Sequence, residues 1–296
     1  MSGIREGTRD SLGRVGYDLL SRALADCGRE WFTGELRVAG SPGGTFHLRN
    51  GLVVCVESPG APGPGALLLR SGRVSGEQWA ELVRESGGSR WPAGGLIAHG
   101  YAGAAQLRVV CVMALQDAAF AVVAGRVDGC EPLDGAEPPA APVAAGEASA
   151  RLLQEATRKL AALAALPYPV RPDRERPVPA LVSRAGARLT ALQRELLTHA
   201  DGRRTARDLA FRTGRGVYTV TVELARMLGE GLLECADAPV PIPVRLPPDC
   251  PGVRPREAQP PPEPPPRPLS LPRRKSHREM NPMSPHMKKK NKCDRN

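Results

Sequence analysis

The sequence is poor in the residues that build metal centres. Its seven cysteines are scattered over 296 residues, and no two have the spacing of about two to four residues that zinc ligand pairs show. The five histidines are equally dispersed. We therefore predict neither a metal site nor a metal cofactor. An odd cysteine number without a secretory signal favours reduced thiols, and Cys55 and Cys111, inside apolar runs, are predicted core residues.

The distribution of apolar residues also predicts no targeting segment and no membrane segment. Residues 1–6 contain no apolar signal core. No apolar stretch is expected to approach the roughly 18 residues that a membrane span needs. These absences predict a cytoplasmic protein with no membrane partner.

Signatures of catalysis are absent as well. The glycine-rich stretch at 60–65 contains prolines and is not followed by Lys and Ser or Thr, so it is not a phosphate loop. His47 and His99 have no neighbouring Ser, Cys or paired carboxylate in the sequence. We predict no catalytic residues, no bound cofactor and no enzymatic activity.

Lysine is nearly confined to one end of the chain. Five of the six lysines follow residue 274, and residues 245–296 hold thirteen basic against five acidic residues. The other 244 residues hold twenty-eight basic and twenty-six acidic residues, so the net charge of +10 belongs mainly to this tail. A proline run at 260–266 predicts polyproline II or disorder. Residues 245–296 are thus expected to form a disordered, Pro-rich, basic tail.

The first half of the chain combines strand and helix patterns, which predicts an α+β fold. Asn50 and Gly51 give the strongest signal, because both central residues of a type I′ hairpin turn need positive φ. Alternating polar and apolar residues flank this turn, and leucines at helical spacing precede it. The expected elements are a helix at 10–29, strands at 34–38, 45–49 and 52–57, and short helices at 66–72 and 76–85.

The rest of this domain is less clearly patterned. Residues 106–119 predict a helix, although the Val-Val-Cys-Val sequence at its centre also suits a strand. Residues 120–127 predict either a strand pair or a strand and a turn, and we place the end of the domain at residue 133. Residues 134–180 are expected to be an Ala/Pro-rich linker that carries one helix at 151–166.

Residues 181–244 have the pattern of a winged helix-turn-helix. An amphipathic run begins at Leu189, Asp201-Gly202 makes a turn, and Thr205 suits the N-cap of a second helix. A second break at 214–216 separates that helix from a third. The expected elements are helices from 189 to 197, 206 to 212 and 217 to about 228, and a strand at 232–235 that opens the wing.

In such a unit the third helix enters the major groove of duplex DNA. Its outward side chains would face bases or sugars, while arginines around the second helix would hold phosphates. The predicted DNA-binding residues are Arg203, Arg204, Arg207, Arg215, Tyr218, Thr219, Thr221 and Arg226. The charge is modest, because residues 181–236 contain nine arginines and no lysine against six acids.

Two resemblances follow from these motifs. Phe32-Thr33-Gly34-Glu35-Leu36-Arg37-Val38, the hairpin from Gly44 to Val54, and Gly65-Ala66-Leu67-Leu68-Leu69 are similar to the PatA-like N-terminal domain family. That resemblance implies a bacterial signalling or regulatory module with no catalytic residues. Asp201-Gly202-Arg203-Arg204-Thr205 and the following residues to Ala210 resemble the helix pair of winged-helix regulators, including MarR-like transcriptional regulators.

Two functions remain open at this level. One is a transcriptional regulator, in which an N-terminal sensory or dimerising domain is joined to a DNA-binding winged helix. The other is a non-catalytic adaptor in a bacterial signalling pathway, whose winged helix contacts protein. The expected partners are duplex DNA for the regulator, and a protein partner or a second copy that associates through the N-terminal domain. A dimer would favour the regulator, since winged-helix repressors usually bind paired half-sites. A monomer with Arg203 and Arg204 paired with acids of its own N-terminal domain would favour the adaptor.

Overall fold

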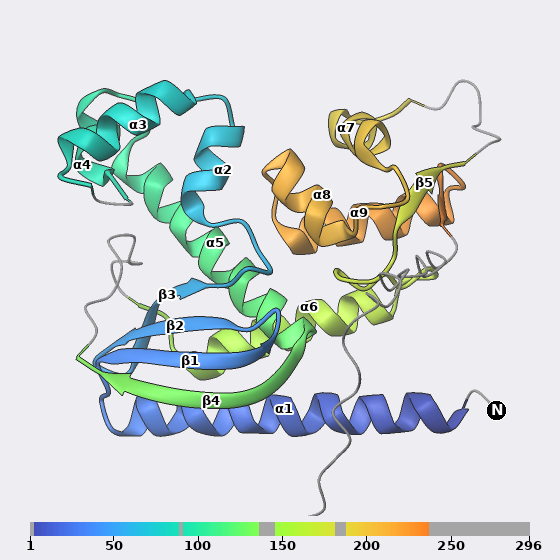
Figure 1. The fold of residues 1–296 in the computed structure, drawn as a ribbon, viewed down its shortest axis with the longest axis horizontal. Helices are drawn as coiled ribbons and strands as arrows, with labels where there is room; N and C mark the ends of the chain where they lie inside the picture. Colours follow the sequence, from blue (N-terminus) through green and yellow to red (C-terminus); the bar gives the residue numbers. More distant parts are fainter. Residues whose placement is uncertain (1–2, 89–90, 136–145, 181–187, 237–296) are drawn as a thin grey trace, which may run out of the picture. The chain divides into compact units, whose positions relative to one another are not determined.

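The computed structural model describes residues 3–88, 91–135, 146–180 and 188–236 (Figure 1). It confirms the α+β class, because helices accompany a four-stranded antiparallel sheet. The predicted basic tail at 245–296 and the part of the winged-helix segment after residue 236 lie outside the described residues.

The sheet has the strand order β3-β2-β1-β4. Its strands are β1 (Gly34–Ser41), β2 (Gly44–Arg49), β3 (Leu52–Glu57) and β4 (Arg126–Asp134), and β4 returns from the second half of the domain to pair with β1. The predicted hairpin is confirmed, since Asn50 and Gly51 have φ of 49° and 74°. These left-handed values are the ones that a type I′ turn requires.

Helices lie before and between the strands. They are α1 (Gly3–Arg29), α2 (Pro64–Arg70), α3 (Gly76–Glu85), α4 (Ala93–Ala98) and α5 (Ala104–Ala124). Helix α3 begins with a capping box: the Ser75 hydroxyl accepts a hydrogen bond from the Gln78 N–H, and the Gln78 side-chain oxygen accepts one from the Ser75 N–H. Leu20 and Leu24 of α1 are fully buried, together with Phe46 of β2.

Helix α5 departs from the sequence interpretation in two ways. It continues to Ala124, so the strand predicted at 120–127 is wrong; residues 120–122 are buried helix and only β4 is extended. Within the described part of the chain, α5 is also the one helix long and apolar enough to cross a membrane by length and composition. The expectation of no such stretch was therefore wrong. A buried core helix passes the same test, and 56% of the most apolar window of α5 is buried.

The predicted linker is more ordered than expected. Helix α6 (Ser149–Ala164) confirms the helix expected there and packs against both α5 and α1. A strap at 165–176 then leads into β5 (Pro177–Pro179), which pairs antiparallel with β6 (Leu233–Cys235). Strand β5 therefore pairs with the strand that follows the last helix of the C-terminal unit.

The C-terminal unit contains three helices, as predicted: α7 (Ala191–His199), α8 (Ala206–Thr213) and α9 (Val217–Gly229). Thr205 caps α8, accepting a hydrogen bond from the Asp208 N–H, and Thr190 caps α7 in the same manner. Strand β6 was predicted to open a wing, but its partner among the described residues precedes α7. We call this part, residues 177–236, the helix-turn-helix unit.

Candidate functional interface

The N-terminus of α9 is capped by a residue from another part of the chain. Its N-cap, Gly216, has no side chain to satisfy the first N–H groups of the helix. The carboxylate of Asp117, on α5, takes that role: it accepts hydrogen bonds from the N–H of Val217 at 2.6 Å and of Tyr218 at 3.0 Å. The helix-turn-helix unit is thereby joined to the N-terminal domain at the start of its third helix.

Asp117 lies in an electrostatic environment of opposing effects. It is only 7% exposed, and this burial raises the pKa of its carboxyl above the ordinary value. The two backbone N–H groups and the nearby Lys159 ammonium act in the opposite direction. The positive end of the α9 dipole also faces the carboxylate. A buried carboxyl group is therefore held by donors that satisfy it.

Tyr218 forms the apolar part of the same contact. Its ring meets the buried Phe120 ring of α5 edge to face, with centroids 5.4 Å apart. The Lys159 ammonium of α6 lies 5.4 Å from the Tyr218 centroid, within cation–π range. Lys159 is the single lysine before residue 275. Three elements, α5, α6 and α9, thus converge on this point.

Helix α2 makes a second contact with the unit. The Arg70 guanidinium donates to the carbonyl oxygen of Arg212, at the end of α8, and lies 3.9 Å from the Glu195 carboxylate of α7. Gly214, in the turn between α8 and α9, has φ of +60°, and a Cβ at this position would overlap the Arg70 side chain. The turn that precedes α9 therefore packs directly against the N-terminal domain.

Four predicted DNA-binding residues remain on the surface. Arg203, Arg215, Thr219 and Arg226 are exposed. Arg226 lies 3.7 Å from the Glu223 carboxylate one turn earlier on α9, which reduces its free positive charge. This exposed set is spread over the turn before α8, the turn before α9 and the outer face of α9.

Three of the other predicted residues are partly buried, and the side chains of Arg204 and Tyr218 contact other parts of the protein. Arg204 donates to the His199 carbonyl at 3.2 Å and pairs with Asp201 at 2.9 Å, so its partners belong to its own turn and not to the N-terminal domain. Arg207 is half-buried and its Nε has no hydrogen-bond partner among the described residues. Tyr218 is half-buried in the interface described above.

Thr221 was predicted to face outward, and this orientation is wrong. Its residue is 0% exposed, and its hydroxyl donates to the Val217 carbonyl at 2.7 Å. The reason is that α9 packs against helices on more than one side, including α8 and α5. A buried hydroxyl with an internal partner has no reach to a base edge.

The structure places carboxylates beside both histidines considered in the sequence, His47 and His99. His47 is 4% exposed, with Glu35 and Glu57 carboxylates at 3.7 Å and 3.6 Å, and both of its nitrogens lack hydrogen-bond partners. His99 is exposed, stacked on Tyr101. Within the described ranges no group of three His, Cys, Asp or Glu side chains has a metal-binding arrangement.

Sequence reasoning missed Asp117, Arg70 and Lys159. One signal was available: Asp117 is the single acidic residue in the apolar segment that became α5. An acid in such a segment needs a polar partner when buried. The sequence did not indicate which residue would be that partner, because Val217 lies 100 residues from Asp117.

Comparison with models of protein families, with curated proteins and with solved structures found no match for this chain.

Proposed function

We propose that this protein is a non-catalytic regulatory adaptor in which the helix-turn-helix unit contacts protein. The observation that carries the proposal is the pair of hydrogen bonds from Val217 and Tyr218 to Asp117. A DNA-binding third helix presents its N-terminal residues to the major groove. Here those residues contact α5, which supports protein contact as the role of this surface.

The N-terminal domain fits this role through its resemblance to the PatA-like family, which implies a bacterial signalling module. We propose a cytoplasmic location for such an adaptor. The interface combines a capped helix end, an aromatic pair and an arginine on a carbonyl oxygen. Polar contacts between parts of a chain break and re-form at a modest cost in free energy. The helix-turn-helix unit could therefore release the N-terminal domain and bind another protein with the same surface.

Transcriptional regulation is the second candidate, and the exposed Arg203, Arg215 and Arg226 favour it. These side chains offer phosphate contacts without rearrangement of the unit. In that case α9 would leave Asp117 before its first turn reached a base. The two candidates therefore differ in what the α9 N-terminus contacts when the protein acts.

The test uses the full chain in a selection from random duplex oligonucleotides, with salt titration of any enriched sequence. If the protein is an adaptor, no sequence motif should be enriched. Weak binding of DNA by the basic tail should then be equal for the wild type and for Arg226→Ala. In parallel, hydrogen–deuterium exchange should show that the amides at the α9 N-terminus are protected in the wild type. These amides should exchange faster in Asp117→Asn. An enriched motif whose affinity drops in Arg226→Ala and Thr219→Ala would overturn the adaptor in favour of the regulator.

A further inference from the structure

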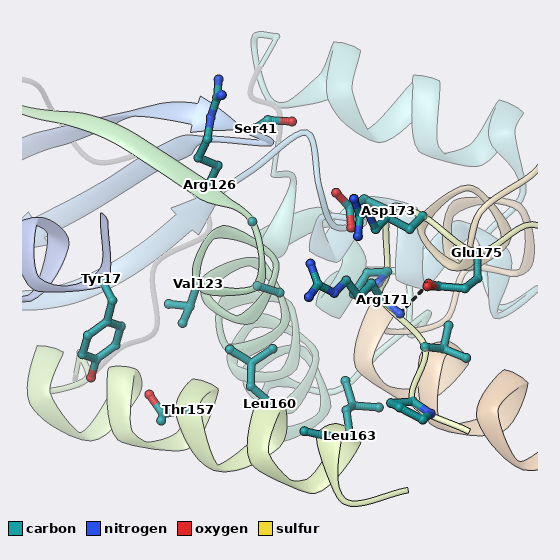
Figure 2. A pocket seen from close by; sticks show the side chains of 17 residues that line it. Tyr17, Ser41, Val123, Arg126, Thr157, Leu160, Leu163, Arg171, Asp173 and Glu175 are labelled. Carbon is teal, nitrogen blue, oxygen red and sulfur yellow. Dashed lines mark hydrogen bonds between the residues drawn. The ribbon is translucent and has the colours of Figure 1, made fainter. Parts of the chain in front are cut away.

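A cleft of about 1250 Å³ lies at the junction of α1, α5, α6 and the strap at 165–176 (Figure 2). Its size is at or above the range of roughly 300–1,000 Å³ common for small-molecule sites. A second cavity of about 380 Å³ shares Tyr17 and Thr157 with it and continues along α6 to Ala150. The two cavities are therefore neighbours along α6.

The floor of the cleft is aliphatic. Val123 from the end of α5, and Leu160 and Leu163 from α6, line it, and Tyr17 supplies the one aromatic ring of the lining (Figure 2). A planar ring ligand would therefore find little to stack on, whereas an alkyl chain would bury its surface against these side chains. The lining of the cleft therefore favours an alkyl chain.

Three arginines line this cleft. The exposed Arg171 side chain carries its guanidinium above Leu160 (Figure 2), and no ion pair of Arg171 is found among the described residues. The neighbouring Glu175 carboxylate is already used, since it accepts the Arg171 backbone N–H at 2.6 Å. Of the other two arginines in the lining, Arg126 is paired with Asp128 at 3.0 Å. Arg174 is exposed and follows the exposed Asp173, which also lines the cleft.

The charge of the ligand follows from these neighbours. Helices α5 and α6 both end at the cleft, and their C-terminal ends carry partial negative charge. A phosphate dianion is disfavoured there, while a single carboxylate opposite Arg171 matches the planar donor pair of a guanidinium. We propose that this cleft binds a free fatty acid, a monocarboxylate on an unbranched alkyl chain.

The site has a route to the helix-turn-helix unit. The carbonyl oxygen of Pro172, in the strap, accepts the N–H of Arg207 at 2.8 Å, in the first turn of α8. A ligand that moves the strap therefore acts on α8. This regulatory consequence rests on the proposed function, whereas the binding site itself does not.

Titration calorimetry of the full chain with dodecanoate, below its micelle concentration, tests the site. Saturable one-to-one binding is expected, with about tenfold loss in Arg171→Ala, which corresponds to about 1.4 kcal/mol. Arg194→Ala removes an exposed arginine of α7 outside the cleft and should bind normally. Ala164→Trp places an indole ring in the lining of the cleft and should weaken binding, while Ala162→Trp adds the same ring at an exposed position outside the lining and should not.

Ligand controls fix the chemistry. Dodecyltrimethylammonium has the chain with the opposite charge, and butanoate has the carboxylate without the chain; neither should bind. The proposal would be overturned if dodecyltrimethylammonium bound as tightly as dodecanoate, or if neither Arg171→Ala nor Ala164→Trp changed the affinity for dodecanoate. It would also be overturned if the protein bound phosphatidylglycerol vesicles but not dodecanoate. Amide exchange at the α9 N-terminus, measured without ligand, tests the adaptor separately, so failure of one proposal is distinguishable from failure of the other.

Discussion

The carboxylate of Asp117 and the backbone N–H of Val217 are 2.6 Å apart, although 100 residues separate them in the chain. Helix caps usually come from the residue just before the helix, because that side chain is already in reach. Here the local position is occupied by Gly216, whose Cα leaves room for the Asp117 oxygens; an added Cβ would lie 3.3 Å from one of them. The cap of α9 is thus a tertiary contact, and its loss reports separation of the two parts.

The pH dependence of stability should carry the signature of Asp117. Burial raises the pKa of this carboxyl in the folded protein above its ordinary value of 3.8. Its contribution to the free energy of unfolding is therefore fully present below that value and is lost as the pH rises through the folded-state pKa. Urea unfolding from about pH 4 to about pH 7 should show the wild type losing stability relative to Asp117→Asn. A difference that stays constant, or grows with pH, would contradict this.

Gly214→Ala should destabilise the protein more than Gly231→Ala. Both glycines have left-handed φ, +60° and +69°, so each alanine carries about 1 kcal/mol of backbone strain. At Gly231 an added Cβ meets nothing within 4 Å, whereas at Gly214 it overlaps Arg70. Urea unfolding of the two variants isolates the contact between α2 and the turn. Equal losses would mean that this contact contributes nothing.

Thr205→Ala should cost about 1 kcal/mol of stability, because it removes the cap of α8. The Thr205 hydroxyl accepts from the Asp208 N–H at 3.3 Å and donates to the Asp208 carboxylate at 2.9 Å. Thr205→Ser keeps the hydroxyl and should retain most of the stability. Thermal unfolding of both variants decides the point, and a serine variant as unstable as the alanine variant would assign the loss to the missing methyl group.

Three of the cysteines should be inert in the folded protein. Burial raises the pKa of Cys55 to about 12 and of Cys111 to about 11, and Cys27 is also buried, so little nucleophilic thiolate exists at neutral pH. In a variant with serine at the other four positions, these thiols should react with a chromogenic disulfide only after denaturant is added. Fast reaction in the absence of denaturant would show that the core around α5 and β3 opens readily.

Several elements were predictable because their signals are local. The Asn50-Gly51 turn, the caps Ser75 and Thr205, and the three helices of the C-terminal unit depend on neighbours within a few residues. Such signals survive in the sequence, since backbone φ preferences and short side-chain hydrogen bonds act within one turn. The α+β class follows from the same local patterns.

Other features were misread where burial outweighs local preference. The end of α5 contains Phe and Val, which favour strands, yet residues 120–122 are buried helix because the surrounding core accepts apolar side chains from several sides. A helix buried on several sides has no polar face, so its periodicity gives no signal. Strand β5 contains two prolines and pairs only through its partner β6, which the sequence places more than fifty residues later.

The sequence by itself determined the turns, the caps and the identity of most helices, because those depend on short-range sterics and hydrogen bonds. Only the tertiary structure decided which predicted DNA-binding residues are exposed, that Thr221 is buried, and that the α9 N-terminus contacts Asp117. These outcomes depend on which distant surfaces exclude water from one another. No local pattern encodes that choice, because an exposed helix end and a docked one can have the same sequence.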